Sequence, residues 1–313
     1  MSTSDAPRRE ISNVALLDLT GAAAATALEG VTRISEVAAI LVPESLLGKL
    51  SSIPMDRVAA TVPIPDGRQV RVFTGQIVLS GDALAAPADG SEETLVVTGQ
   101  LILTSPAVNV GRDVVVLGQV VAPTGSETGL GLALRRLTGQ VEYYPYTEGA
   151  RVEVREGGLL GGEALANPAG QPNEVLLVTG TLVLTSPVES IGFQQVVVLG
   201  NVLVPRGAES GVAGRLRTQG GRVIAYDAPP RVFEGKHTLS AGYFELLDSP
   251  ITLIIDGTCV IDDDVTPELI RQKVAGLALD GKLVAPRHVI PALQVVALVL
   301  DGKISASNDA DRD

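Results

Sequence analysis

The chain has 313 residues, a formal net charge of −12, one cysteine and no tryptophan. A surface of this sign repels phosphate backbones and anionic lipid headgroups, so neither nucleic acid nor a membrane is expected as a partner. The single Cys259 cannot form an internal disulfide, MSTSDAPRREIS carries no apolar signal segment, and no apolar run is long enough to span a bilayer, so we expect a cytoplasmic protein.

Short apolar runs rich in Val, Leu and Ile are predicted to be β-strands, because β-branched side chains suit a pleated sheet. In chain order they begin at Val14, Val37 and Val58, at Leu95 and Val114, at Val175 and Val196, and at Thr252, Val274 and Val295. Neighbouring runs within each group start about 20 residues apart, which is the length of one solenoid coil. The runs are almost continuously apolar, which is typical of parallel strands that are buried on both faces.

Two segments near the ends of the chain are predicted to be short helices. They are VPESLLGKL, residues 42–50, and TPELIRQKV, residues 266–274. Pro43 and Pro267 would occupy the first helical position, where a missing N–H costs nothing, and Thr266 can cap the second helix. Each segment leads into a strand, so the terminal coils of the fold are expected to contain a helix.

A long internal repeat organises these elements. LVVTGQLILTSP, residues 95–106, returns as LLVTGTLVLTSP, residues 176–187. A strand glycine recurs at Gly21, Gly99, Gly180 and Gly257, and a strand that ends in proline recurs at Pro43, Pro123, Pro205 and Pro286. Each marker returns after about 80 residues, so two independent markers keep nearly the same period.

The sequence predicts an all-β protein, a parallel β-helix or β-solenoid of about four repeats of roughly 80 residues, built from coils of about 20 residues. We expect one solenoid over residues 12–307, with repeats at approximately 12–92, 93–173, 174–249 and 250–307. A disordered polar tail is expected at 1–11 and an acidic tail at 308–313. No six-residue apolar period is present, so right-handed winding is the default. Val115 and Val197 should occupy equivalent buried positions.

Residue types that carry catalysis are sparse. His237 and His288 share no motif, and two scattered histidines with one cysteine do not supply a zinc site. The run Asp262–Asp264 lacks the ligand spacing of a calcium loop and is interpreted as a turn before a helix. Cys259 lies in a β run and is expected to be an inert, buried thiol. We therefore expect no catalytic residue, no metal ligand and no cofactor, and interpret the chain as non-enzymatic.

One basic and aromatic cluster favours a surface for protein binding, because Arg and Tyr are enriched at interfaces. Its members are Arg135, Arg136, Tyr143, Tyr144 and Tyr146, with Arg215, Arg217 and Tyr226 in the equivalent copy. An ordinary exposed turn is the alternative interpretation of the same residues.

The apolar strands at the two ends of the chain are candidate assembly edges, because an unpaired strand edge can be extended by another chain. The residues concerned are Val14, Leu16 and Leu17 at one end, and Val296, Leu298 and Leu300 at the other. The competing hypothesis is that the short helices at 43–50 and 267–274 cover the last layers and keep the chain a discrete rod.

The glycine-interrupted strands VTGQLILTS and VVVLGNVLV resemble the parallel β-solenoid of the bactofilins, which are bacterial cytoskeletal polymers. The resemblance is one of pattern and covers about residues 60–260. It implies a cytoskeleton-like protein that forms filaments. The chain departs from that family in its greater length, in the helical coils at both ends and in lacking an apolar membrane-targeting segment at its start.

We therefore expect a structural protein, a subunit that assembles with copies of itself into a filament or scaffold. Two alternatives stay open. One is a β-solenoid module that binds another protein as a monomer or dimer, and the other is an enzyme built on a β-helix.

Overall fold

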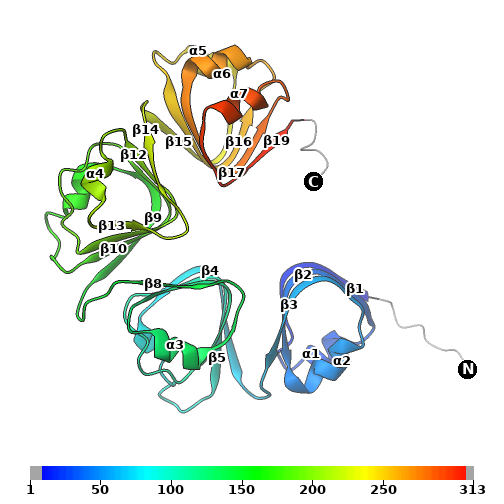
Figure 1. Ribbon diagram of the computed structural model, residues 1–313. Helices are drawn as coiled ribbons and strands as arrows, with labels where there is room; N and C mark the ends of the chain where they lie inside the picture. Colours follow the sequence, from blue (N-terminus) through cyan, green and yellow to red (C-terminus); the bar gives the residue numbers. More distant parts are fainter. Residues whose placement is uncertain (1–8, 308–313) are drawn as a thin grey trace, which may run out of the picture. The chain divides into compact units, whose positions relative to one another are not determined.

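The computed structural model describes residues 9–307, and it is mainly β with four sheets in which all strands run parallel (Figure 1). The chain divides after Tyr146 into two compact units, and each unit contains two of the sheets. The tails expected at residues 1–8 and 308–313 lie outside the described residues. Residues 9–11, which were also expected in the tail, belong to the first strand.

The first unit holds two sheets. The first sheet has the order β1 (Arg9–Asp18), β2 (Val31–Pro43), β3 (Met55–Ile64). The second has the order β4 (Gln69–Leu79), β5 (Glu93–Leu103), β6 (Asp113–Pro123), with β7 (Leu134–Leu137) and β8 (Val141–Tyr144) both paired to β6.

The second unit repeats this plan. In the third sheet β9 (Val152–Leu160) pairs with β10 (Val175–Leu184), which pairs with β11 (Gln195–Leu199) and β12 (Val202–Pro205), and these pair with β13 (Leu216–Thr218) and β14 (Val223–Tyr226). In the fourth, β15 (Pro230–Leu239) is followed by β16 (Ile251–Ile261) and β17 (Val274–Ala285), and β18 (Ala297–Leu300) and β19 (Lys303–Ala306) both pair with β17.

Short helical segments lie between the strands of all four sheets, not only near the ends of the chain as expected. They are α1 (Ala24–Ala27), η1 (Glu44–Leu46), α2 (Leu47–Ser51), η2 (Gly81–Leu84), α3 (Glu127–Ala133), η3 (Gly162–Ala166), α4 (Glu209–Val212), α5 (Ala241–Glu245), α6 (Pro267–Lys273) and α7 (Ile290–Val295). Thr266 caps α6 by accepting a hydrogen bond from the Leu269 N–H at 3.2 Å, as predicted. Pro43 instead ends β2, and the helical segment begins at Glu44.

The helices that connect the strands of the fourth sheet form a row that follows the stack of strands. α5, α6 and α7 come from successive turns, and each contacts the next (Figure 1). α6 therefore lies between two other helices along one side of the core, so the segment 267–274 does not cover the last layer as considered above. Whether the segment 43–50 covers a layer stays a prediction. Within residues 9–307 no helix has the length and apolar character needed to cross a membrane.

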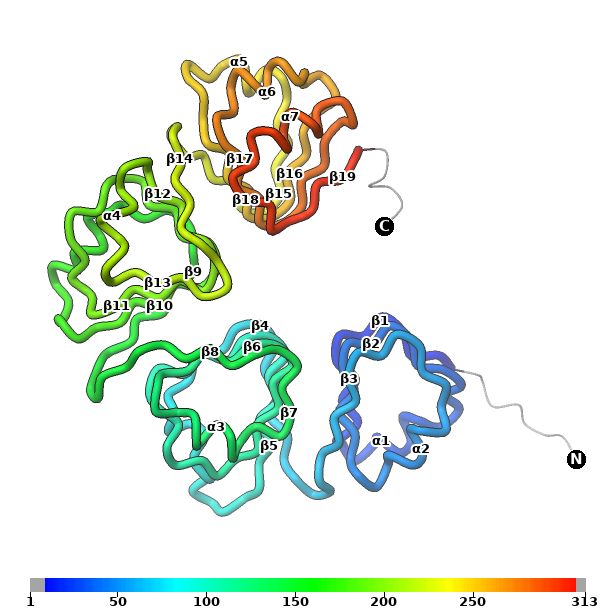
Figure 2. The backbone as a smooth tube through the Cα atoms, viewed as in Figure 1, coloured from blue at the N-terminus to red at the C-terminus, as the bar shows by residue number. Residues whose placement is uncertain are grey.

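Within each sheet, a strand pairs with the strand that lies about 20 residues further along the chain. Gly99 pairs with Gly118, for example, and Val78 with Ile102. One strand pair therefore corresponds to one turn of the backbone, and successive turns lie over one another (Figure 2).

The sheets start one strand earlier than the repeats drawn from the sequence, because β4, β9 and β15 each open a new sheet. The repeat in the sequence does not show which strand begins a repeat. In the structure, the first strand of each sheet is the one that has no partner on one side. One continuous solenoid over 12–307 stays a prediction.

The middle strands of each sheet are buried on both faces, which explains their almost continuous apolar sequence. In β5 the side chains of Leu95 and Val97 point into the core of the second sheet, while Val96 packs in a cluster with Leu41 and Val62 of the first sheet. This two-sided burial is what the apolar runs predicted.

Val115 and Val197 occupy equivalent buried positions, as expected from the repeat. Each is 1% exposed. Val115 pairs with Val96 on one side and Arg136 on the other. Val197 pairs with Leu177 and Arg217 in the same arrangement, so the alignment of the two copies is confirmed at this position.

The repeated Thr-Ser-Pro phrase has a direct structural role. The hydroxyl of Ser105 accepts a hydrogen bond from the Gly81 N–H at 2.9 Å, one turn earlier in the stack. In the second copy Ser186 accepts from the Gly162 N–H at 2.8 Å. A Cβ atom on either glycine would lie 2.2 Å from the carbonyl oxygen of the following proline, Pro106 or Pro187. The phrase therefore repeats because each serine and proline fixes the start of a short helical segment in the neighbouring turn.

A column of glycines marks the bend in each turn of the second sheet. Its members are Gly75, Gly99, Gly118 and Gly139. Gly99 and Gly118 have φ values of +136° and +151°, and a Cβ on Gly118 would lie 1.8 Å from the Gly99 carbonyl oxygen. A side chain at the bend would push adjacent turns apart, so the column permits close stacking.

The first sheet makes the corresponding bend without glycine. Asn13, Glu36 and Arg57 have φ values of 57°, 54° and 52° and lie in register on β1, β2 and β3. Left-handed backbone costs a non-glycine residue free energy. The Arg57 guanidinium lies 2.6 Å from a Glu36 carboxylate oxygen, and this ion pair links two of the three bends.

The glycine column makes a testable prediction for stability. Gly118→Ala should lower the free energy of unfolding by about 2–4 kcal/mol, because the methyl group meets the Gly99 carbonyl and the backbone lies in the left-handed region. The matched control is Gly131→Ala in α3, where a Cβ would meet no atom within 4 Å. That change should be neutral or stabilising. Thermal denaturation followed by circular dichroism measures both, and equal midpoints for the two variants would contradict the stacking argument.

Candidate assembly edges

The predicted basic and aromatic cluster is divided between the core and the surface. Tyr144 is 0% exposed and its hydroxyl donates to the Leu103 carbonyl oxygen at 2.7 Å. Tyr226 is 4% exposed and donates to the Leu184 carbonyl at 2.6 Å. Burial raises the pKa of both phenols. Each of these tyrosines lies in the last strand of its sheet and anchors that strand two turns back, so neither forms part of a binding surface.

Three of the predicted arginines make bonds inside the chain. The Arg135 Nε lies 2.6 Å from an Asp113 oxygen. Arg136 donates to the Thr61 carbonyl of the first sheet at 2.6 Å, and Arg215 donates to the Ile191 carbonyl at 3.0 Å. These contacts hold strands and loops together.

The other members of the predicted cluster differ in exposure. Arg217 is exposed, whereas Tyr143 and Tyr146 are half-buried. The structure therefore does not gather the eight residues into a single exposed stripe.

Arg135 belongs to an ion-pair network around two buried carboxylates at one end of β5 and β6. Asp113 lies between Arg68 and Arg135, and Glu93 lies between Arg71 and Arg112. The carboxylates are 11% and 8% exposed, so each needs an opposite charge to compensate its lost hydration. The network fixes the entry of these strands. Sequence reasoning missed it because its members are far apart in the chain.

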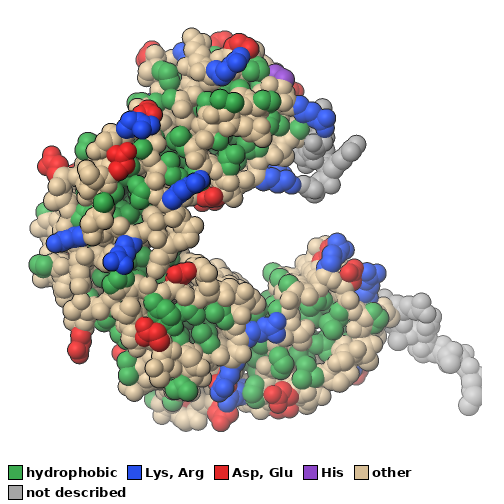
Figure 3. Space-filling model, in the orientation of Figure 1, with side chains coloured by type: hydrophobic (Ala, Val, Ile, Leu, Met, Phe, Trp, Pro, Cys, Tyr) green, Lys and Arg blue, Asp and Glu red, His purple; other side chains and the backbone are tan. Residues whose placement is uncertain are grey.

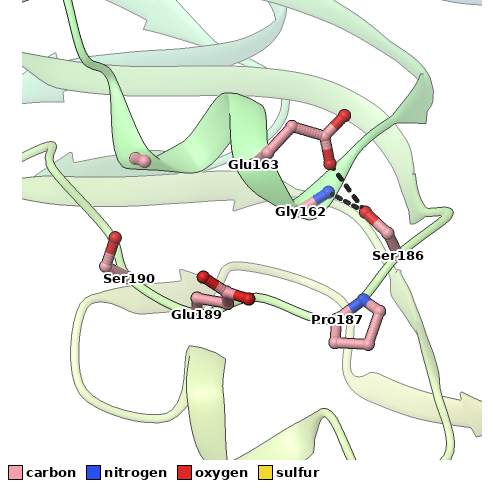
Figure 4. A pocket seen from close by; sticks show the side chains of 7 residues that line it. Gly162, Glu163, Ser186, Pro187, Glu189 and Ser190 are labelled. Atoms are coloured by element: carbon pink, nitrogen blue, oxygen red, sulfur yellow. Dashed lines mark hydrogen bonds between the residues drawn. The ribbon is translucent and has the colours of Figure 1, made fainter.

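A shallow pocket on the third sheet contains a polar pair (Figure 4). The Gly162 N–H donates to the Ser186 hydroxyl, which donates to a Glu163 oxygen at 2.8 Å. The backbone N–H of Glu163 and the Ser186 hydroxyl hold the pKa of that carboxyl below its ordinary value. Glu189 and Ser190 line the opposite side. Because Ser186 already has the structural role described above, we assign no chemistry to this pocket.

The histidines and the cysteine lie in separate environments. His237 is exposed and packs edge-on against Phe233, and His288 contacts the Val265 carbonyl oxygen at 3.2 Å. Cys259 is fully buried, and burial raises the pKa of its thiol to about 11. The residues from 9 to 307 contain no group of three or more His, Cys, Asp or Glu side chains placed to hold a metal ion.

The acidic run Asp262–Asp264 forms a turn before α6, as interpreted from the sequence. One oxygen of Asp264 accepts a hydrogen bond from the Ala241 N–H at 3.0 Å. This bond ties the turn to the start of α5 in the preceding turn of the stack.

Five of the six predicted assembly-edge residues lie on edge strands. Val14, Leu16 and Leu17 are in β1, an edge strand of the first sheet, but all three are half-buried against neighbouring cores. At the other end, Leu300 is 42% exposed in β18. Leu298, also in β18, packs against the cluster between the third and fourth sheets. Val296 follows the end of α7 and is not in the strand.

The core of the second sheet is less completely covered at the two ends of its stack than in the middle. Inward-facing residues of the middle strands β5 and β6 are at most 2% exposed. In the two end layers Leu84 of η2 and Tyr144 of β8 are fully buried, but other residues that pack on the core are only partly buried, namely Phe73, Ile77 and Leu79 of β4 and Leu137, Val141 and Tyr143 of β7 and β8. Further edges of the same kind occur at β9 and β15, which start the next two sheets. Such edges are templates for another chain.

The residues directly before and after the bend glycines also stack on one another in successive strands. These columns of residues differ between the second and the fourth sheet. In the second sheet the column after glycine is glutamine throughout, at Gln76, Gln100, Gln119 and Gln140. Gln100 donates to Gln119 at 3.0 Å. The repeated phrase TGQ in the sequence could have indicated this glutamine column. That the glutamines contact one another, however, follows only from the register of the strands.

In the fourth sheet the columns are charged. The position before glycine is acidic in every layer, at Glu234, Asp256, Asp280 and Asp301. The position after it carries Lys236, Thr258, Lys282 and Lys303. Partial burial, together with repulsion from Asp256 and Asp301, raises the pKa of Asp280.

No protein-family model matches this chain, and no curated protein or solved structure is significantly similar to it.

The buried tyrosines yield a prediction with an internal control. Tyr144→Phe and Tyr226→Phe should each lower the free energy of unfolding by about 1 kcal/mol, because a buried carbonyl loses its hydrogen-bond donor. Tyr146→Phe removes a hydroxyl from a half-buried ring and should change stability by less than about 0.5 kcal/mol. Chemical denaturation measures all three. A larger effect at Tyr146 than at Tyr144 would show that the anchoring assignment is wrong.

The acidic column predicts the sign of a pH effect. Because the folded-state pKa of Asp280 is raised, its protonated form is favoured in the fold, and the stability that this form contributes is lost as pH rises from about 4 through the folded pKa. Asp280→Asn should therefore raise the melting temperature at pH 7 and change it little below pH 4. Melting curves between pH 3.5 and 8 test this, with Asp263→Asn in the exposed turn as the control. A lower melting temperature at pH 7 would contradict it.

Proposed function

We propose that the protein is a non-enzymatic structural protein whose copies associate through the open ends of its parallel sheets to form a filament or scaffold. The observation that carries this proposal is the partly buried core at the end layers of the second sheet, beside strands whose outer edge lacks a partner in the sheet. Adding a strand there would satisfy backbone groups and bury apolar side chains in one step.

The finer architecture that we propose is a parallel, right-handed β-solenoid with one turn for about every 20 residues. The pairing of Gly75 with Gly99 and of Gly99 with Gly118 supports it, as do the turns that lie over one another in Figure 2. The likeness to bactofilins rests on strand pattern, and it agrees in kind with a cytoplasmic, cytoskeleton-like role.

The mixture of side chains at the surface supports association of copies through apolar contacts and backbone pairing more than through attraction between opposite charges. On the face shown in Figure 3 hydrophobic side chains lie at the surface, and basic and acidic side chains are interspersed among them. Exposed apolar residues beside an open core favour contact with another protein surface.

A second candidate function is a β-solenoid module that binds another protein without forming polymers. The charged columns of the fourth sheet favour it, because rows of acidic and basic side chains on an exposed bend are suited to a partner of complementary charge.

Wild-type protein tests the proposal directly. We expect the average mass measured by light scattering to rise with concentration, and negative-stain micrographs to show ordered rods or ribbons of varied length. Circular dichroism of the assembled sample should retain the β signal of the dilute protein, which separates assembly from aggregation of unfolded chains. A constant monomer mass up to the highest concentration reached would reject self-assembly and favour the binding module.

A further inference from the structure

We propose that copies of the chain join head to tail through the second sheet, with β7 and β8 of one copy adding to β4 of the next as one more parallel layer. This junction rests on the self-association proposed above and specifies which sheet mediates it. The partner is a second copy of the same chain.

The register of the second sheet defines the junction. Within the sheet, glycine stacks on glycine and glutamine on glutamine through every layer. Continuing the stack by one layer places Thr138, Gly139 and Gln140 of one copy on Thr74, Gly75 and Gln76 of the next. Thus the last layer presents the residues that the first layer needs as its neighbour, and the glutamine ladder continues across the boundary.

Gly75 shows the space that the junction would fill. A Cβ on Gly99 would lie 2.2 Å from the Gly75 carbonyl oxygen, and one on Gly118 would meet the Gly99 carbonyl, so each glycine faces the layer before it. Gly75 begins the column, and a Cβ there would meet no atom within 4 Å. In the junction the Gly139 carbonyl of the preceding copy occupies that space. A glycine at position 75, which its φ of +81° already favours, also leaves room for that carbonyl.

The apolar residues of the two end layers are also complementary. Following the columns, Leu137 stacks on Phe73 of the next copy and Val141 stacks on Ile77. These side chains pack against the core but are only partly buried in the single chain. The junction covers both sets at once, which supplies a hydrophobic driving force.

The fourth sheet does not offer an equivalent junction. Stacking its last layer on its first would place Asp301 on Glu234 and Lys303 on Lys236. Both contacts join like charges across adjacent strands, which is destabilising. The neutral glutamine column therefore favours the second sheet over the fourth, where a junction would add to the like-charge contacts already present between the layers of that sheet.

A matched pair of glycine substitutions tests the junction in the full-length chain. Gly75→Ala and Gly235→Ala lie at equivalent positions, with φ values of +81° and +74° and no atom within 4 Å of the added Cβ. The backbone strain is therefore alike in both. We expect Gly75→Ala to raise the concentration needed for assembly on the order of tenfold, because its methyl group blocks the next layer. Gly235→Ala should assemble like wild type.

A charge exchange tests the register itself. Gln76→Lys combined with Gln140→Lys places two ammonium groups face to face and should raise the assembly concentration by roughly tenfold. Gln76→Lys combined with Gln140→Glu places opposite charges there and should restore assembly. Within one chain both positions have neutral glutamine neighbours, Gln100 and Gln119, so folding should be preserved. Circular dichroism and melting temperature verify this.

Sedimentation velocity distinguishes the outcomes. Loss of assembly in Gly75→Ala and in the double-lysine variant, with assembly kept in Gly235→Ala and in the lysine–glutamate variant, supports the junction. Unchanged assembly in all four variants overturns the junction while self-assembly stands. Wild type that stays monomeric rejects self-assembly itself. Loss in Gly235→Ala alone would place the contact at the fourth sheet and overturn the assignment.

Discussion

The close approach of adjacent backbone turns at their bends is the constraint on which the other features depend. Where Gly118 passes Gly99, no space remains for a side chain. This contact sets the register of β5 and β6, and the register then places most residues of one strand over their equivalents in the next turn. The buried valines and leucines and the Ser-Pro contact with the preceding turn follow from this stacking of equivalent residues.

Stacking in register also determines which residues suit the interior. A layer between two others must be thin, so its inward side chains are aliphatic and fully covered. Larger side chains suit the end turns of a stack, which have a neighbouring layer of their own sheet on one side only. Eight of the nine aromatic residues lie in the first or last turn of a sheet, and Phe193 is the exception. Tyr144 and Tyr226 show the result, since each ring fills an end layer while its hydroxyl binds a carbonyl two turns earlier.

The same rule brings identical polar residues together, with opposite consequences for neutral and charged side chains. A glutamine both donates and accepts, so a column of glutamines bonds along its length, as Gln100 and Gln119 do. A column of carboxylates repels itself, and the raised pKa of Asp280 is the local sign of that repulsion. Each sheet therefore presents at its ends the chemistry of its own columns, and a neutral column can be continued by a copy where a charged column resists it.

The sequence alone predicted the repeat length, the parallel arrangement and the middle strands of each sheet, because these depend on apolar runs, glycines and prolines that recur at fixed intervals. It did not predict the first strands β4, β9 and β15, and the run expected from Val295 begins at the end of α7. It also predicted the burial of Cys259, the equivalence of Val115 and Val197, and the capping of α6 by Thr266. Tertiary structure decided where each sheet begins, since the phase of a repeat is fixed only by a strand that loses its partner. It also separated Tyr144 and Tyr226 from the surface and enclosed Asp113 and Glu93 among arginines. These outcomes depend on contacts between residues one to three turns apart, and the properties of a single residue in the chain do not encode which of its neighbours the stack will bring beside it.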